Sequence, residues 1–208
     1  MTTLSAGEVT TVTHENGKYK VQASGTVFLK NEPIRFLPKN SAILKIANYE
    51  NRPSWNLELN DNEYRGILEV RLVDGILTNI NELNLEDYLK GQGEVSNSEE
   101  PEKIKAIMTA ARTYARFYME KDEKFPGKPY HLDDDPNVSQ KYLGYGFEKR
   151  APNVAAGIDA TRGKVVTYNG ELVKTPYFNQ SDGTSTKSAF EVWGWTFAPY
   201  LVSVSDSF

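Results

Sequence analysis

A single glutamate, Glu94, stands at a turn of the chain where its side chain could do acid–base chemistry. Two glycines, Gly91 and Gly93, interrupt the chain directly before it. Glycine readily ends a helix, because it adopts positive φ angles without a steric penalty. A carboxyl group held on such a turn between two helices can donate a proton and take one back. The alternative is a solvated surface glutamate, which is the commoner situation for this residue type.

Small hydroxyl and amide side chains gather in a second segment, residues 179–186. Such groups both donate and accept hydrogen bonds, so they are suited to lining a sugar site. An ordinary polar loop would have the same composition, and both interpretations stay open here.

Metal-ion chemistry is not predicted. The chain has no cysteine, and its two histidines, His14 and His131, are far apart in the sequence. A zinc site is therefore not expected. The aspartates at 133–135 lack the spacing and central glycine of a calcium loop, so a capping or solvated turn is expected there. We predict no metal and no other cofactor.

Two helices must position Glu94, a short one before it at residues 85–90 and a long one after it at 101–121. Pro101 suits a first helical turn, because it has no N–H group to leave unpaired. Apolar residues at helical spacing predict one buried face on the long helix. They are Ile104, Ile107, Met108, Ala111, Ala115 and Tyr118.

Arg112 lies next to this apolar face. A buried arginine needs an anionic or carbonyl partner, so Arg112 would orient a loop or a carboxylate of the site. A surface arginine whose stem lies along apolar neighbours fits the composition equally well.

Most of the remaining chain is predicted to form short strands, because β-branched and aromatic runs alternate with turn sequences. The fold class is therefore α+β: a strand-rich body with the long helix and short helices packed against it around an active-site cleft. A further short helix is expected at 153–163. The predicted strands are 9–12, 19–23, 26–29, 42–46, 64–72, 76–83, 164–168, 171–174, 175–178 and 201–204.

Composition limits the classes of function. Of the 208 residues, 39% are hydrophobic, which permits a packed core. The net charge of −4 and the lack of a basic tract predict no nucleic-acid partner. No apolar run approaches the roughly 20 residues of a membrane span, and no signal peptide is evident. We expect a β-rich N-terminal region at 1–63, packed on a domain at 64–208 whose C-terminal end is truncated.

Short sequence blocks follow one another in a fixed order from residue 64 onward. They are Tyr64-Arg65-Gly66, Asn81-Glu82-Leu83, Tyr88-Leu89-Lys90-Gly91, Ala110-Ala111-Arg112-Thr113-Tyr114, Gln140-Lys141-Tyr142-Leu143-Gly144, Thr161-Arg162-Gly163, Tyr177 with Asn179, Ser181 and Gly183, and Val192-Trp193-Gly194. In this order they resemble the SpoIID/LytB family of bacterial cell-wall proteins. The resemblance covers roughly residues 64–206.

The resemblance implies that residues 64–208 form the catalytic domain of a lytic transglycosylase, which cuts peptidoglycan glycan strands. The family's catalytic glutamate corresponds to Glu94, although the spacing from Gly91 is shorter than usual. Glu99 and Glu100 would need an insertion to take its place. Some members hold zinc in the region corresponding to 130–140, where only His131 remains, so zinc is not carried over.

Other residues are expected to bind substrate or to support the site. Aromatic rings suit the apolar faces of sugars, and polar groups suit their hydroxyls and amides. Several of these residues should gather around Glu94, with Arg112 and Tyr114 more as supports than as contacts. The set is Arg112, Tyr114, Gln140, Tyr177, Asn179, Ser181 and Trp193.

A single carboxylate favours one mechanism. Glycoside hydrolases usually need two carboxylates, and the sequence offers one well-placed acid. A lytic transglycosylase needs only one, because N-acetylmuramic acid supplies its own C6 hydroxyl and forms a 1,6-anhydro ring. The alternative is a non-catalytic module that binds peptidoglycan or modulates an amidase, as LytB-type members are described. The expected partners are glycan strands, with an amidase under the alternative, and the expected location is extracytoplasmic.

Overall fold

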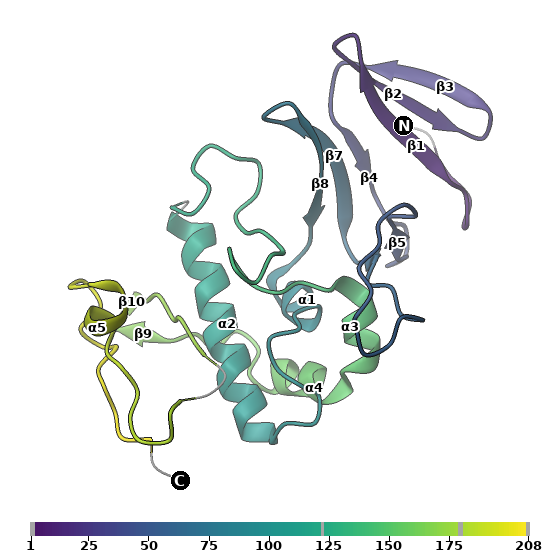
Figure 1. Cartoon of the computed structure of the whole chain (residues 1–208). Helices are drawn as coiled ribbons and strands as arrows, with labels where there is room; N and C mark the ends of the chain where they lie inside the picture. The colour runs from purple at the N-terminus through teal and green to yellow at the C-terminus, as the bar shows by residue number, and fades with distance from the viewer. Residues whose placement is uncertain (1–2, 122, 179–180, 207–208) are drawn as a thin grey trace.

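The computed structural model describes residues 3–121, 123–178 and 181–206 and has an α+β fold, which confirms the predicted class. A group of helices occupies the middle of the molecule, between an N-terminal sheet and a C-terminal segment (Figure 1). None of the helices in these residues is both long enough and apolar enough to cross a membrane.

The N-terminal strands form an antiparallel sheet with the order β1-β2-β3. The first turn takes positive φ angles at Asn16 (51°) and Gly17 (75°), as a tight hairpin requires. The hydroxyl of Tyr19 accepts a hydrogen bond from the Leu72 N–H at 2.9 Å and so links this sheet to the next. The strands are β1 (Thr10–Glu15), β2 (Lys18–Ala23) and β3 (Thr26–Lys30).

A second sheet, with the order β4-β7-β8, leads the chain into the helices. Leu68 and Val70 are buried in its central strand. Glu69 between them is buried as well, because Arg35 forms an ion pair with it at 2.9 Å. The strands are β4 (Ile34–Phe36), which was not predicted, β7 (Ile67–Val73) and β8 (Ile76–Glu82), beside a short ladder of β5 (Leu44–Lys45) and β6 (Glu63–Tyr64).

The helices pack on one another and form the hydrophobic core. The predicted stripe of the long helix is buried at four positions, but Ile107 and Tyr118 are only partly buried, because they lie at its edge. The core combines Leu89, Ile104, Met108, Ala111, Val154 and Ile158. The helices are α1 (Leu85–Lys90), α2 (Pro101–Lys121), α3 (Gly144–Arg150), which was not predicted, and α4 (Pro152–Ala160).

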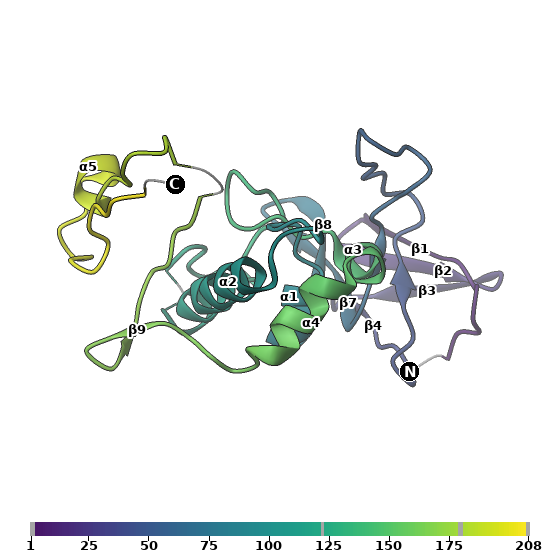
Figure 2. The ribbon, with the colours of Figure 1, turned by 90° about the horizontal axis from the view of Figure 1, so that it is seen from below.

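The C-terminal segment lies at the end of the molecule away from the N-terminal sheet, beside α2 (Figures 1 and 2). The strands predicted at 164–168 and 171–174 form in shortened versions and pair as a hairpin through Asn169 and Gly170. The strands predicted at 175–178 and 201–204 do not form, because neither segment pairs in a ladder; an isolated bridge joins Ser185 and Ser205, just beyond the second segment. The elements here are β9 (Thr167–Tyr168), β10 (Glu171–Leu172) and α5 (Ala189–Trp193), a helix that was not predicted.

Candidate functional site

Glu94 lies on a tight loop that pairs with a segment distant in sequence. The Leu143 N–H donates to the Gly91 carbonyl at 2.8 Å, and the Gly93 N–H donates to the Lys141 carbonyl at 2.9 Å. Gln92 and Tyr142 form an isolated antiparallel bridge between these two hydrogen bonds. Glu94 is the next residue beyond this bridge, so its backbone position is fixed.

The glycines permit this close approach and are not left-handed helix stops, which corrects the expectation from sequence. Gly91 caps α1 with a φ angle of −87°. A Cβ atom on Gly91 would lie 2.5 Å from the Tyr142 ring, and one on Gly93 would lie 2.7 Å from the Leu143 side chain. A larger residue at either position would push the two segments apart.

The carboxyl group of Glu94 is held through one oxygen. The backbone N–H of Lys141 donates to Glu94 Oε1 at 2.5 Å. The other oxygen, Oε2, has no comparable hydrogen bond among the residues that the structure describes, although the Tyr177 hydroxyl lies close enough to interact with this carboxyl group. Because Oε1 is an acceptor, the acid form of Glu94 carries its proton on Oε2. The half-buried side chain thus offers one free oxygen to a ligand.

Three tyrosines, which we call the tyrosine wall, lie near enough to this carboxyl group to be affected by its charge: Tyr88 from α1, Tyr114 from α2 and Tyr177 from the segment after β10. Burial raises the pKa of each hydroxyl above its ordinary value, and the charge of Glu94 raises it further. Each hydroxyl therefore stays protonated at neutral pH and can donate a hydrogen bond.

Gln140 holds two members of the tyrosine wall. It is buried, with 1% of its surface exposed. The Tyr88 hydroxyl donates to Gln140 Oε1 at 3.2 Å, and Gln140 Nε2 donates to the Tyr177 hydroxyl at 3.1 Å. Since the Tyr177 oxygen accepts from Gln140, its own proton is left for an acceptor on the Glu94 side. The structure thus brings Gln140, Tyr177 and Tyr114 to Glu94.

Arg112 forms its hydrogen bonds with other residues than Glu94, as a support would, and pairs with Glu86. Its side chain is 1% exposed, which also excludes a surface arginine. Two nitrogens donate to Glu86, each at 2.9 Å, and the other bonds reach the Thr161 hydroxyl and the carbonyls of Ile158 and Lys164. All five guanidinium N–H groups are used, so none remains for a substrate. Arg112 joins α1, α2 and α4.

The remaining predicted residues lie in or near the C-terminal segment. The Ser181 hydroxyl accepts a hydrogen bond from the Gly183 N–H at 3.1 Å, within a turn. Trp193 ends α5, where its ring stacks on Trp195. Within the described ranges, no interaction joins Ser181 or Trp193 to Glu94. Asn179 lies outside the described residues.

Two contributors to the site were missed from the sequence, the Tyr88 side chain and the backbone of Lys141. Tyr88 precedes the buried Leu89 on a short helix, and its spacing did not separate it from an ordinary core residue. Lys141 acts through its N–H group, which every residue except proline has. The signal that could have found it is the pair of glycines, which calls for a second backbone close by.

The triple aspartate behaves as a turn. The Asp135 N–H donates to Asp133 Oδ1 at 2.9 Å, and the Asn137 N–H donates to Asp135 Oδ1 at 2.8 Å. Across the part of the chain that the structure describes, no three histidine, aspartate or glutamate side chains gather as a metal ion would require.

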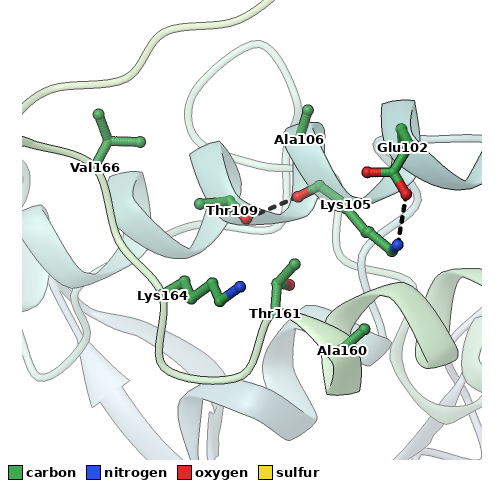
Figure 3. A pocket seen from close by; sticks show the side chains of 8 residues that line it. All are labelled: Glu102, Lys105, Ala106, Thr109, Ala160, Thr161, Lys164 and Val166. Atoms are coloured by element: carbon green, nitrogen blue, oxygen red, sulfur yellow. Dashed lines mark hydrogen bonds and ion pairs between the residues drawn. The ribbon is translucent and has the colours of Figure 1, made fainter.

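A separate cavity of about 560 Å³ lies between α2 and the end of α4 (Figure 3). Its only carboxylate, Glu102, forms an ion pair with Lys105 at 2.6 Å and has 84% of its side chain exposed. Thr109 and Thr161 both donate to helix carbonyls. With its acid neutralised and its hydroxyls engaged, this cavity offers no acid–base group, and we place the candidate site at Glu94.

The fold and the site define an α+β protein with one carboxylate held on a glycine loop beside tyrosines. Residues 73–168 match the family model named SpoIID, described as stage II sporulation protein. Over this part of the chain the match and the relatives below support a place in the SpoIID/LytB family.

Three relatives are similar to parts of this chain. An uncharacterized protein of Brachyspira hyodysenteriae is 36% identical over 149 residues, which cover 70% of this chain and 38% of that protein. Stage II sporulation protein D of Bacillus subtilis is 29% identical over 61% of this chain and 40% of its own length. The amidase enhancer of Bacillus subtilis is 32% identical over 51% of this chain and 13% of its own length. The chain thus spans less than half of each relative.

Proposed function

We propose that this chain cleaves the glycan strands of peptidoglycan as a lytic transglycosylase, with Glu94 as its single acid and base. The family match and the relatives support a function related to the cell wall. The observation that carries the finer proposal is the geometry of Glu94, with Oε1 fixed by the Lys141 N–H and Oε2 free beside the tyrosine wall.

The reaction needs one proton to move twice. Glu94 Oε2 gives its proton to the glycosidic oxygen as the bond from C1 of N-acetylmuramic acid to N-acetylglucosamine breaks. The resulting carboxylate then takes the proton of the C6 hydroxyl on the same N-acetylmuramic acid, as that oxygen bonds to C1. Glu94 returns to its acid form, no water is consumed, and the product ends in a 1,6-anhydro ring.

Ring closure competes well with water because it is unimolecular. Well-oriented intramolecular reactions reach effective molarities of about 10⁵ M or more. The tyrosine wall would favour this outcome by occupying the space around the carboxylate and by donating hydrogen bonds to the sugar. The Tyr177 hydroxyl, oriented by Gln140, suits such a donor.

Replacing Glu94 tests the proposal directly. Glu94→Gln keeps the shape and the Lys141 contact but removes the transferable proton, so cleavage of purified glycan strands should fall about 10²–10⁴-fold. Glu100→Gln is the matched control, an exposed acid on the same connection to α2, and should cleave normally. Mass spectrometry of the wild-type products should find 1,6-anhydro-N-acetylmuramic acid ends.

Two outcomes would contradict this mechanism. Full activity of the Gln variant would mean that another group is the acid. Ordinary reducing ends would mean that water attacks with the help of a second carboxylate.

A non-catalytic role is the second candidate, favoured by the similarity to the amidase enhancer. Such a module would bind glycan strands and modulate an amidase without cutting. It predicts no products from the wild-type chain and equal glycan binding by the wild type and Glu94→Gln. Either role places the working site outside the cytoplasm, where peptidoglycan lies.

A further inference from the structure

Three aromatic rings form a continuous stack on the C-terminal segment. The Trp193 and Trp195 rings lie 4.7 Å apart at 27°, and the Trp195 and Phe197 rings lie 5.1 Å apart at 31°. Trp193 is 49% exposed and Phe197 is 57% exposed, so the two outer rings face solvent. We call these three residues the aromatic platform.

Local structure fixes the platform. A capping box between Ser188 and Glu191 begins α5, and Gly194 ends it in the left-handed region at φ 69°. That turn brings the residues after the helix back beside Trp193, and the Trp195 N–H donates to the Ala189 carbonyl at 3.4 Å. The rings are therefore arranged before any ligand arrives.

Lys174 connects the platform to the Glu94 site. Its ammonium lies 5.8 Å from the centre of the Trp195 ring and 5.3 Å from that of Phe197. On its other side it lies 5.5 Å from the Tyr118 ring of α2. Tyr118 in turn packs edge-on against Tyr114 of the tyrosine wall, 4.8 Å away. Tyr114, Tyr118 and Lys174 thus link the tyrosine wall to the platform along α2.

The chemistry of these aromatic rings matches a polysaccharide. The faces of pyranose rings carry C–H groups and their edges carry hydroxyls, so flat aromatic rings bind the faces while solvent keeps the edges wet. Contiguous exposed apolar side chains commonly mark a binding surface. Because these rings are linked to the candidate site, the ligand that accounts for both is one long chain of sugars.

We propose that the aromatic platform is a second glycan-binding site, which holds the same strand several sugars away from the bond that Glu94 cuts. This inference rests on the proposed function, and it assigns Trp193 to a distant part of the substrate. Long glycan strands reach both sites, whereas short oligosaccharides reach only one. The chain should therefore prefer long strands.

The test compares substrates of different length. Trp193→Ala and Phe197→Ala, singly and together, remove exposed rings. Phe190→Ala is the control, because Phe190 lies in the same helix, is 64% exposed and is outside the stack. In the double variant, the ratio of kcat/KM for long strands to that for tetrasaccharides should fall roughly tenfold, mainly through KM. An unchanged ratio, or the same fall with Phe190→Ala, would overturn the proposal.

A binding experiment separates this inference from the catalytic one. Glu94→Gln, with and without the two platform substitutions, is sedimented with insoluble peptidoglycan. Loss of co-sedimentation on removing the platform supports a glycan site even if the wild-type chain never cleaves. Unchanged co-sedimentation overturns the platform as a glycan site and would assign the exposed rings to a protein contact.

Discussion

Glu86 lies in the first turn of α1 and Glu94 on the loop that follows the helix. The two carboxylates differ in how many hydrogen bonds hold them. Glu86 receives two hydrogen bonds from the buried Arg112 and a third from the Gly163 N–H. Glu94 receives one, from a backbone N–H, and keeps a free oxygen. Both carboxylates are partly buried, so exposure does not separate them.

The difference lies in how fully each carboxylate is used. A carboxylate whose oxygens are taken by a paired arginine cannot also bind a ligand, and its partner has no donor to spare. A carboxylate held through one oxygen is oriented and still reactive. The buried ion pair between Arg112 and Glu86 holds α1, α2 and α4 together, and we call these three helices the frame. The glycine loop, residues 91–94, holds Glu94 with one oxygen left for a ligand.

The largest effect on stability is expected from breaking the frame. Arg112→Ala leaves Glu86 in a largely buried position without its partner, which should cost about 3–5 kcal/mol of unfolding free energy. Glu94→Gln should change it by less than about 0.5 kcal/mol, as surface changes usually do. Urea unfolding of the two variants measures the contrast. Equal losses would mean that Glu94 is a frame residue as well.

The next largest loss of stability is expected from truncating residues of the hydrophobic core. Met108 is fully buried on α2, so Met108→Ala should cost about 2–5 kcal/mol. Ile107→Ala removes a side chain that is only partly buried and should cost less. Thermal unfolding of the pair tests the order. A larger loss for Ile107→Ala would contradict the burial described for this face of the helix.

Local patterns in the sequence predicted the frame better than the site. The stripe of α2, with Pro101 at its start, depends on spacing within one segment, and the helix formed where expected. The site depends on contacts between segments far apart in the chain, such as Lys141 with Glu94 and Gln140 with Tyr88. The spacing of residues within one segment does not predict such contacts. The predictions of strands at 175–178 and 201–204 were wrong for the same reason, because a strand needs a pairing partner from elsewhere in the chain. Glu94 was predicted from glycines interpreted as helix stops and from the family resemblance, whereas in the structure those glycines permit a close approach.

The glycine loop should show a smaller effect on stability with a larger consequence for activity. Gly93→Ala places a Cβ atom 2.7 Å from the Leu143 side chain, so it should cost about 1–3 kcal/mol and shift Glu94. Adding Leu143→Ala makes room for the new methyl group. The double variant should therefore recover part of the lost cleavage, and simply additive losses would show that the contact does not position Glu94.

The smallest expected effect is the pH dependence of the unfolding free energy that arises from the titration of Glu86. Burial alone would raise its pKa, but the hydrogen bonds from Arg112 and the Gly163 N–H outweigh that and lower the pKa below the ordinary value of 4.5. The folded carboxylate therefore resists protonation more than the unfolded one. Its contribution to stability is complete above about pH 4.5 and is lost as the pH falls through the lower, folded value.

Glu86→Gln removes this titration. The variant should be less stable than the wild type at pH 7, because Arg112 loses its charged partner. Between pH 5 and pH 3, however, its unfolding free energy should fall less steeply than that of the wild type, since one fewer proton is taken up on unfolding. Urea unfolding at several pH values measures both slopes. Parallel slopes would mean that the pair with Arg112 does not hold the charge of Glu86, and the contrast with Glu94 would then lose its electrostatic basis.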